Sequence, residues 1–284
     1  MTRRILVTGS EGLLGVRVCA ELRRRGLTVR GYDLVHGDDI LDAERLARAL
    51  DGCFACLHLA AVADLYDADA DPDRCMRINV EGTRQVAEAC RAAGARLLYA
   101  STCCVYGNNG VELSDETAPP APSERYAQSK LDGEAFVALA GDDGVSLRLA
   151  TFYGPDMRKT LATAVFLRRA LAGETIEIHG DGRQTRCYTH VDDIATGIAT
   201  VLESPARPRV VNVAGDEVCS VLELARIAQR VTGVEVPLRF VADRPGQIRH
   251  SKIDSSLLRG LGWAPRWSLA EGLQACAEAL RGEA

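Results

Sequence analysis

A glycine-rich segment near the amino terminus constrains the fold of this chain more than any other feature. Gly9-Ser10-Glu11-Gly12-Leu13-Leu14-Gly15 follows the apolar run 4–8 and precedes a stretch in which Leu14, Val18 and Leu22 recur at helical spacing. Glycines permit a tight turn there, and the first N–H groups of the following helix have no partner within that helix. The segment therefore predicts a strand, a glycine turn and a helix whose N-terminus receives a phosphate group.

Short apolar runs alternate with amphipathic helical stretches through the first half of the chain. Helical connections make neighbouring strands parallel and cover both faces of the sheet. We therefore expect an α/β fold with a doubly wound parallel sheet, the Rossmann arrangement, and a ligand crevice at the carboxyl ends of its strands. The expected strands lie near residues 4–8, 27–33, 53–60, 96–101 and 145–150.

The alternation ends near residue 150, where turn-rich sequence begins. We expect residues 1–150 to form the Rossmann domain. An apolar run at 210–213 predicts one more buried strand, so the chain should return to that domain at about 188–215. Residues 151–187 and 216–284 are expected to form a smaller C-terminal substrate lobe.

The composition argues against several classes of protein. With 47% hydrophobic and 26% charged residues the chain is typical of a soluble enzyme, and no apolar run is long enough to span a membrane. A net charge of −5 argues against a nucleic-acid-binding surface, so we expect neither a membrane nor a nucleic acid as partner. Ten cysteines without a secretion signal predict free thiols and a cytoplasmic location. Cys53 and Cys56 lie in an expected strand, where residues three apart face opposite sides, and we expect no metal site.

An acidic residue ends the second expected strand. Asp33 can accept hydrogen bonds from both hydroxyls of an adenosine ribose, and its charge would repel a 2′-phosphate. The sequence therefore favours NAD over NADP. Asp39 and Ile40 follow after a short excursion and are candidates for contact with the adenine, although a loop aspartate can equally be merely solvated.

A series of motifs runs in order along nearly the whole chain. Its segments are Gly9-x-x-Gly12-x-x-Gly15, His58-Leu59-Ala60-Ala61, Asn79-Val80-x-Gly82-Thr83, Ser101-Thr102-x-x-Val105-Tyr106-Gly107, Tyr126-x-x-x-Lys130, Leu147-Arg148 with Tyr153-Gly154-Pro155, Gly180-Asp181-Gly182-x-Gln184-x-Arg186, Val191-Asp192-Asp193-Ile194 and Arg244-Pro245-Gly246. The series resembles the extended short-chain dehydrogenase/reductases, specifically their NAD-dependent epimerase/dehydratase branch that acts on nucleotide sugars. The segments at 180–186 and 191–194 look like that family's substrate-lobe signature, and Arg244-Pro245-Gly246 resembles its second phosphate-contacting arginine.

This resemblance implies NAD as the cofactor, a UDP-, dTDP- or GDP-linked sugar as the substrate, and a homodimer. The paired N–H donors of a guanidinium suit phosphate oxygens, so Arg186 and Arg244 together fit a diphosphate. Thr151 stands where the family often has an asparagine and Cys187 replaces a common aspartate, so the substrate stays open. The implied cofactor contacts are Gly9, Glu11, Gly12, Leu13, Leu14, Asp33, Asp39, Ile40, Leu59, Ala60, Ala61, Asn79, Ala100, Tyr126 and Lys130. The implied substrate contacts are Thr102, Thr151, Arg186 and Arg244.

Tyr126 and Lys130 lie four residues apart in a helix expected to begin near residue 123, so both side chains leave one face. A phenol is a weak base at pH 7, but Lys130 and a nicotinamide's positive charge both favour the phenolate. We expect Tyr126 to take the proton from a sugar hydroxyl as a hydride leaves that carbon. The hydroxyl of Thr102 is expected to hydrogen-bond the same oxygen.

Cys103 and Cys104 are the point at which the chain departs from its dehydratase relatives, which carry an Asp-Glu pair after this threonine. Thiols stay largely protonated at neutral pH unless a cation lowers their pKa, which weakens the case for dehydration. Cys104 occupies the position of a cysteine acid/base in the GDP-fucose synthase group, although no partner histidine is evident. Cys103 is expected to face the substrate if the dehydratase alignment holds, and either thiol also suits plain packing.

Three hypotheses follow. The leading one is NAD-dependent epimerisation of a nucleoside-diphosphate sugar through a transient ketone. The second is a dehydratase or 3,5-epimerase-type enzyme that uses Cys103 or Cys104 as acid and base. The third is a catalytically silent NAD-sensing regulator, which the intact Thr102, Tyr126 and Lys130 oppose.

Overall fold

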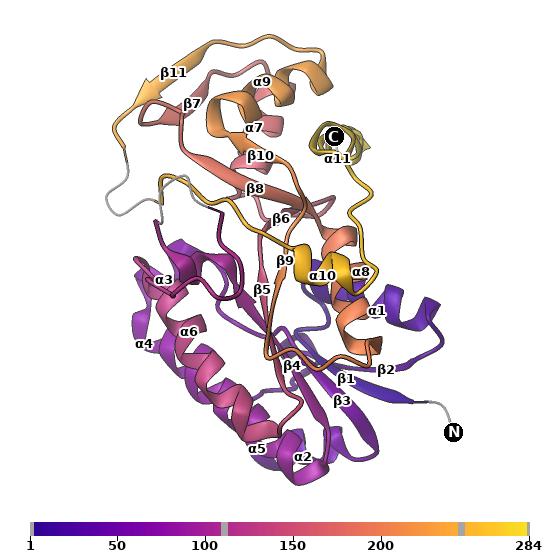
Figure 1. The fold of residues 1–284 in the computed structure, drawn as a ribbon. Helices are drawn as coiled ribbons and strands as arrows, with labels where there is room; N and C mark the ends of the chain where they lie inside the picture. The colour runs from indigo at the N-terminus through magenta and orange to yellow at the C-terminus, as the bar shows by residue number, and fades with distance from the viewer. Residues whose placement is uncertain (1–2, 109–112, 244–247, 283–284) are drawn as a thin grey trace.

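The computed structural model describes residues 3–108, 113–243 and 248–282. A large parallel sheet flanked by helices forms one part of the molecule, and a smaller lobe lies beyond the carboxyl ends of its strands (Figure 1). Arg244 lies outside the described residues.

Six parallel strands form the large sheet in the order β2-β1-β3-β4-β5-β9. The predicted α/β class with a parallel Rossmann-like sheet is confirmed. The strand order reverses between β1 and β3, and in doubly wound folds the ligand crevice opens at such a switch point. The strands are β1 (Arg4–Thr8), β2 (Thr28–Tyr32), β3 (Cys53–His58), β4 (Arg96–Thr102), β5 (Val145–Leu149) and β9 (Val210–Val213).

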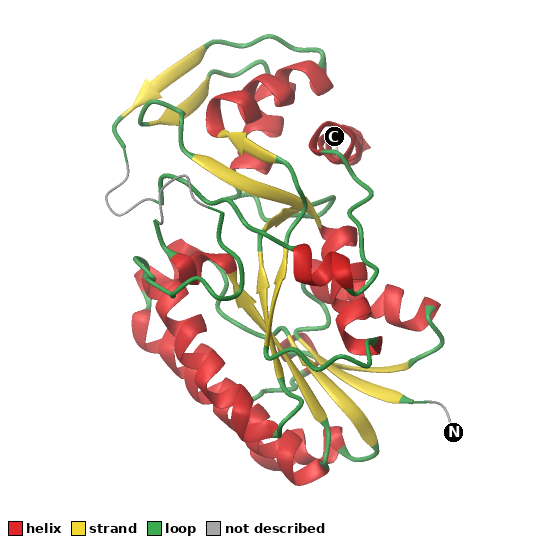
Figure 2. Cartoon of the chain, in the orientation of Figure 1, coloured by secondary structure: helices red, strands yellow, loops and turns green. Residues whose placement is uncertain are grey.

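Helices cover both faces of this sheet, as Figure 2 shows. Ile5 and Val7 of β1 pack toward α1 and α8, whereas Leu6 between them packs toward α2 and α5. This alternation follows from the two-residue repeat of a strand and makes each strand apolar on both sides. The helices are α1 (Leu13–Arg24), α2 (Ala43–Leu50), α3 (Leu65–Ala70), α4 (Pro72–Met76), α5 (Thr83–Ala93), α6 (Arg125–Val137) and α8 (Val191–Glu203), with a π-helical stretch at Arg77–Gly82 and 3-10 turns at Leu34–His36, Cys103–Tyr106 and Ala138–Ala140.

One detail of β3 differs from the sequence expectation. The register against β1 shifts between Arg4 and Ile5, which pair with Cys53 and Ala55. The extra residue turns Phe54 toward α1, so Cys53 and Cys56 both pack on the α2 side. The expectation that they face opposite sides is therefore wrong, because a bulge breaks the two-residue repeat. Within the described residues, no group of three or more His, Cys, Asp or Glu side chains could hold a metal ion.

The smaller lobe has its own apolar core. Two short sheets, β10-β8-β6 and β11-β7, pack with three helices around Phe166, Leu167, Leu224 and Leu273. Its elements are β6 (Thr151–Tyr153), α7 (Ala162–Leu171), β7 (Ile176–His179), β8 (Thr185–His190), β10 (Val218–Ser220), α9 (Val221–Thr232), β11 (Leu238–Val241) and α11 (Leu269–Gly282). Helix α10 (Ser256–Gly260) lies beside β9 of the large sheet.

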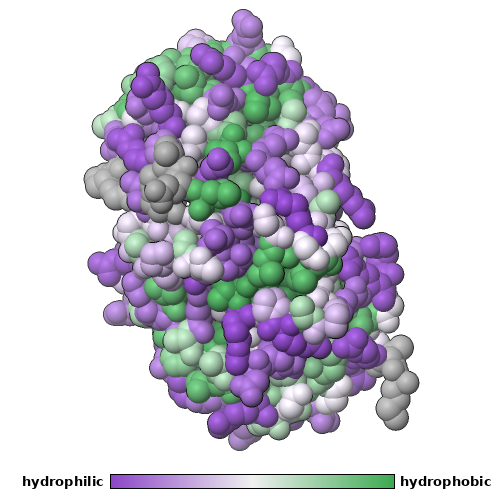
Figure 3. Space-filling model, in the orientation of Figure 1, coloured by the Kyte–Doolittle hydropathy of each residue, from purple (hydrophilic) through white to green (hydrophobic). Residues whose placement is uncertain are grey.

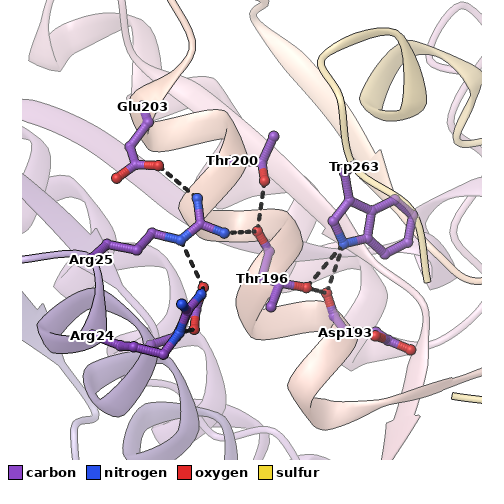
Figure 4. Close-up of polar contacts among 8 residues, drawn as sticks. Arg24, Arg25, Asp193, Thr196, Thr200, Glu203 and Trp263 are labelled. Atoms are coloured by element: carbon purple, nitrogen blue, oxygen red, sulfur yellow. Dashed lines mark hydrogen bonds and ion pairs between the residues drawn. The ribbon is translucent and has the colours of Figure 1, made fainter. Parts of the chain in front are cut away.

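Side-chain hydrogen bonds connect helix α8 to the end of α1 and to the segment after α10 (Figure 4). Arg25, just after α1, donates to Glu203 at 2.6 Å. On the other side, the indole N–H of Trp263 donates to the carbonyl of Asp193 at 3.1 Å. Trp263 comes from the range 216–284 expected in the substrate lobe, yet it packs in the core under the large sheet.

Hydrophilic and hydrophobic areas alternate on the face of the molecule seen in Figure 3. Figure 3 shows hydrophilic side chains over much of one face, with hydrophobic ones gathered in patches near its middle. Among the described residues, none of the helices combines the length and the apolar character needed to cross a membrane.

Candidate active site

The glycine segment forms a close-packed turn between β1 and α1. Gly9 has a φ of +69°, and a side chain at Gly15 would place its Cβ 2.1 Å from the carbonyl oxygen of Gly9. The helix has Gly12 as its N-cap, with no side-chain cap and no acidic residue in its first turn. This end of α1 therefore offers backbone N–H groups that no capping side chain occupies, which suits a pyrophosphate.

Asp33 lies at the carboxyl end of β2 and faces the glycine turn. Its carboxylate accepts hydrogen bonds from the backbone N–H of Glu11 at 3.0 Å and of Val35 at 3.1 Å. Asp33 thus fixes the loop and remains only half-buried, so oxygen lone pairs are left for a ribose.

The next two predicted contacts lie in the following loop. The carboxylate of Asp39 accepts from the N–H of Leu41 at 2.9 Å, and Tyr32 donates to its carbonyl at 2.7 Å. Ile40 is buried against Gly82, where an added Cβ would come within 2.5 Å of its side chain. Both residues therefore shape this loop.

Leu59, Ala60 and Ala61 follow β3 and line the other side of the switch point. The N–H groups of Leu59 and Ala60 donate to the hydroxyl of Thr8. Gly9 lies directly opposite, since a Cβ there would stand 2.8 Å from the nitrogen of Ala60. These residues are half-buried, so they can contact a dinucleotide that crosses the turn.

Asn79 and Ala100 lie deeper. The side-chain amide of Asn79 exchanges hydrogen bonds with the backbone of Val62 and donates to Ser129 of α6 at 2.9 Å. It is fully occupied within the protein, so it fixes the segment after β3 against α6. Ala100 is buried in β4.

His58 lies buried between Thr8 and Thr83, whose hydroxyls are 2.7 and 3.1 Å from its ring nitrogens. Burial lowers the pKa of His58 to about 3, and the charge of Lys130 adds to that effect. A histidine held neutral in this way suits a structural role.

Three predicted catalytic side chains come together at the end of β4. Thr102 is the last residue of that strand, and α6 presents Tyr126 and Lys130 four residues apart. The hydroxyl of Thr102 lies close enough to the phenol of Tyr126 to lower its pKa. The ammonium group of Lys130, a residue only 3% exposed, lies 4.9 Å from the ring centroid of Tyr99. Thr102, Tyr126 and Lys130 are called the redox trio below.

Burial controls the protonation of this trio. Burial raises the pKa of the Tyr126 phenol, neighbouring Cys104 adds to the rise, and the hydrogen bond with Thr102 opposes it. Burial also lowers the pKa of Lys130 from 10.5 to about 8. Lys130 therefore stays mostly protonated at neutral pH, whereas Tyr126 needs further positive charge to ionise.

The two cysteines after Thr102 face different surroundings. Cys103 is 5% exposed, and its thiol donates to the carbonyl of Arg148 at 3.1 Å. Cys104 is half-buried, and its backbone N–H donates to the hydroxyl of Thr102 at 3.2 Å. Its thiol raises the pKa of Tyr126 electrostatically. Cys103 is expected to face the substrate, and the turn after β4 places its buried thiol against the backbone of β5, so Cys104 is the more exposed of the two. Burial raises the pKa of both thiols, so both are protonated at neutral pH.

Two of the predicted substrate contacts lie in the lobe. Thr151 begins β6 and pairs with Tyr188 of β8, and both Thr151 and Arg186 of β8 are half-buried. Arg186 donates to the carbonyl of Thr185 at 2.8 Å. The guanidinium therefore keeps further donors for a phosphate.

Two charged residues near the trio were not singled out from the sequence. Burial raises the pKa of Glu124, and the charge of Arg186 opposes that rise. Arg158 pairs with Asp64 at 3.4 Å, and its charge lowers the pKa of Tyr126. Glu124 lies two residues before Tyr126, so its closeness in sequence could have predicted that it lies near the trio. Arg158 is distant in sequence, and only the fold brings it to the site.

Known proteins resemble the chain over nearly its full length. Residues 5–214 match the family described as the NAD dependent epimerase/dehydratase family. The UDP-glucose 4-epimerase of Mycolicibacterium smegmatis is 30% identical over 308 residues, which cover 98% of each chain. The dTDP-glucose 4,6-dehydratase of Streptomyces griseus is 30% identical over 307 residues, covering 97% of this chain and 93% of that one.

A solved structure agrees with these relatives. The UDP-glucuronic acid 4-epimerase of Bacillus cereus, in complex with UDP-glucuronic acid and NAD, superposes with a TM-score of 0.92 at 27% identity. The match covers 99% of this chain and 100% of that one. The relatives thus share an architecture while their names carry different sugars and different reactions.

Proposed function

This chain belongs to the NAD-dependent epimerase/dehydratase family, and we propose that it inverts one carbon of a nucleoside-diphosphate sugar through a transient ketone. The observation that carries the proposal is the redox trio, in which two hydroxyls and a buried ammonium converge at the end of β4. A UDP-linked sugar is the first substrate to test, because two of the relatives described above are named for UDP-sugars.

The residues around the switch point fit NAD. The glycine turn leaves room for a pyrophosphate at the start of α1, and the half-buried carboxylate of Asp33 suits an unphosphorylated ribose. Bound NAD would supply the acceptor and donor of the hydride. We therefore assign Gly9, Gly12, Asp33 and Ala60 to cofactor binding.

Tyr126 is the proposed proton acceptor for the sugar hydroxyl. Its raised pKa disfavours the phenolate in the protein alone, so positive charge must accumulate before the tyrosine can act. Arg158 supplies one such charge. Lys130, one helical turn after Tyr126 on α6, is proposed to supply a second. Thr102 would hydrogen-bond the substrate oxygen as its charge develops.

Epimerisation needs one proton and one hydride to leave the sugar, a rotation of the ketone, and the return of both, whereas elimination of water needs a further acid and base. Both thiols after Thr102 have raised pKa values, and Cys103 faces the core. They are poor substitutes for the carboxylates of the dehydratases. A protein that only sensed NAD would have no need of a tyrosine paired with a buried lysine.

Dehydration is the second candidate, and Glu124 is the observation that favours it. Its raised pKa and its electrostatic contact with Cys104 give a carboxyl group beside the trio that could donate a proton. The similarity of the chain to a dTDP-glucose 4,6-dehydratase also supports this second candidate.

Incubation with UDP-, dTDP- and GDP-hexoses and UDP-glucuronate, with products identified by NMR, tests the proposal. We expect an epimer from the wild type and a loss of roughly 1,000-fold in kcat for Tyr126→Phe. Full activity in Tyr126→Phe would contradict the mechanism. A dehydrated sugar whose formation collapses in Glu124→Gln would establish the second candidate.

A further inference from the structure

A buried polar cluster lies directly behind the redox trio, and the proposed chemistry does not use it. Glu134 follows Tyr126 and Lys130 at the same four-residue interval, so the three side chains share one side of α6. Its carboxylate accepts from the hydroxyl of Ser101 at 2.5 Å and from Nε and Nη2 of Arg148 at 3.0 and 2.8 Å. The side chains of Glu134 and Arg148 are only 9% and 5% exposed.

Arg148 is itself held in place by the sheet. It pairs in register with Ser101 of β4 on one side and with Asn212 of β9 on the other. Its guanidinium carbon lies 4.8 Å from the ring centroid of Tyr106, whose hydroxyl donates to Asn212 at 2.7 Å. The fork that grips Glu134 is therefore fixed to three strands of the sheet.

Helix α6 and strand β4 approach closely next to Glu134. A Cβ at Gly133 would come within 2.3 Å of the hydroxyl of Tyr99, so only glycine fits there. Tyr99 also donates to the carbonyl of Lys130 at 3.3 Å. Gly133 thus permits the approach of α6 to β4, and Glu134 fixes its position.

A buried ion pair is a poor source of stability, because the desolvation of both charges offsets their attraction. Two apolar side chains of similar size would hold a helix against a sheet at least as well. A two-pronged ion pair does something that packing does not, since it fixes both the distance and the orientation of the two elements.

We propose that Glu134 and Arg148 are positioning residues that set Tyr126 and Lys130 of α6 at the working distance from Thr102 of β4. Ser101 precedes Thr102 directly, so one carboxylate joins the helix that carries the proton acceptor to the strand that carries its partner. This inference rests on the proposed hydride-transfer function of the trio.

The deciding variants separate position from stability. In Glu134→Gln we expect kcat to fall about tenfold to hundredfold, with KM changed less than about threefold, since small displacements of reacting groups cost rate. The double variant Glu134→Leu/Arg148→Met removes both buried charges, so its melting temperature should match or exceed that of the single variant. Its kcat should stay as low.

Glu88→Gln is the matched control, because it breaks the exposed pair of Glu88 with Arg84 at 2.7 Å on α5. All its parameters should stay within about twofold of the wild type. A folded double variant with wild-type kcat would overturn the inference and reduce the cluster to packing.

Failure of the proposed function would look different. If the wild type turns over no nucleotide sugar, the NAD-loaded protein is titrated by ultraviolet absorption of tyrosinate, with Tyr126→Phe subtracted. We expect Glu134→Gln to move the pKa of Tyr126 by about one pH unit. An unmoved titration would reject the positioning role independently of any sugar.

Discussion

The two halves of the candidate active site, the glycine turn and the end of β4, differ in whether backbone or side chains form them. Around the glycine turn the proposed ligand-binding surface is mostly backbone, shaped by Gly9 and Gly15 and fixed by Asp33. At the end of β4 it consists of side chains that arrive from β4, α6 and the lobe. A backbone site tolerates almost no substitution, because an added Cβ collides with fixed main-chain atoms. A side-chain site can change its chemistry one residue at a time, as the relatives' different reactions illustrate.

The sharpest test of the backbone half is Gly15→Ala. The new Cβ would stand 2.1 Å from the carbonyl oxygen of Gly9, so the turn must deform. We expect NAD affinity, measured by calorimetry, to fall at least roughly 1,000-fold, or about 4 kcal/mol. Gly260→Ala is the control, since no atom lies within 4 Å of its added Cβ. NAD binding by Gly15→Ala within about threefold of the wild type would break the comparison.

Lys130 belongs to the side-chain half, and its burial has a pH signature in folding. Its pKa is about 8 in the folded protein against 10.5 otherwise, so the unfolded chain binds the extra proton between those values. Stability therefore rises with pH from about 8 to 10.5, and the full cost of roughly 3 kcal/mol is present below pH 8. Lys130→Met should be more stable than the wild type at pH 7 by up to that amount, in urea unfolding without NAD.

The advantage of Lys130→Met should shrink above pH 8 and vanish near pH 10.5. Lys159→Met, at an exposed position, should show no such trend. If the wild type were as stable as Lys130→Met at pH 7, other interactions of the ammonium group would offset the cost of burying it, and the prediction would be wrong.

The two cysteines give the smallest expected effects and the finest division within the side-chain half. Cys103→Ser should lower the free energy of unfolding by about 1 kcal/mol, because a hydroxyl replaces a thiol in the core. Cys104→Ser should leave stability unchanged, and kcat should stay within about threefold in both. A loss of more than about tenfold in kcat for Cys104→Ser would point to proton transfer through sulfur.

Local spacing made much of this site predictable. The glycine turn, Asp33 after β2 and the four-residue interval of Tyr126 and Lys130 are all relations between near neighbours in sequence. The periodicity of apolar residues gave the parallel sheet in the same way. The prediction for Cys53 and Cys56 was wrong because one extra residue in β3 shifts the side-chain alternation, and a bulge has no local marker in this apolar run.

Local sequence pattern also could not place Arg158 and Trp263, or distinguish Cys103 from Cys104. Nothing next to Arg158 in the sequence places its charge near Tyr126, and nothing next to Trp263 places its ring under the large sheet. Cys103 and Cys104 are chemically identical neighbours, and only the direction of the turn after β4 separates them.

The sequence alone determined that this chain forms a parallel sheet, has a glycine turn suited to a dinucleotide after its first strand and carries a tyrosine–lysine pair on one helix face. Those properties depend on the allowed backbone angles and on helix and strand periods, which act over a few residues. Tertiary structure alone decided which thiol faces the site, which charges surround Tyr126, and that Glu134 meets Arg148. Those contacts join elements far apart in the chain, so they exist only after the sheet has closed and its helices have packed.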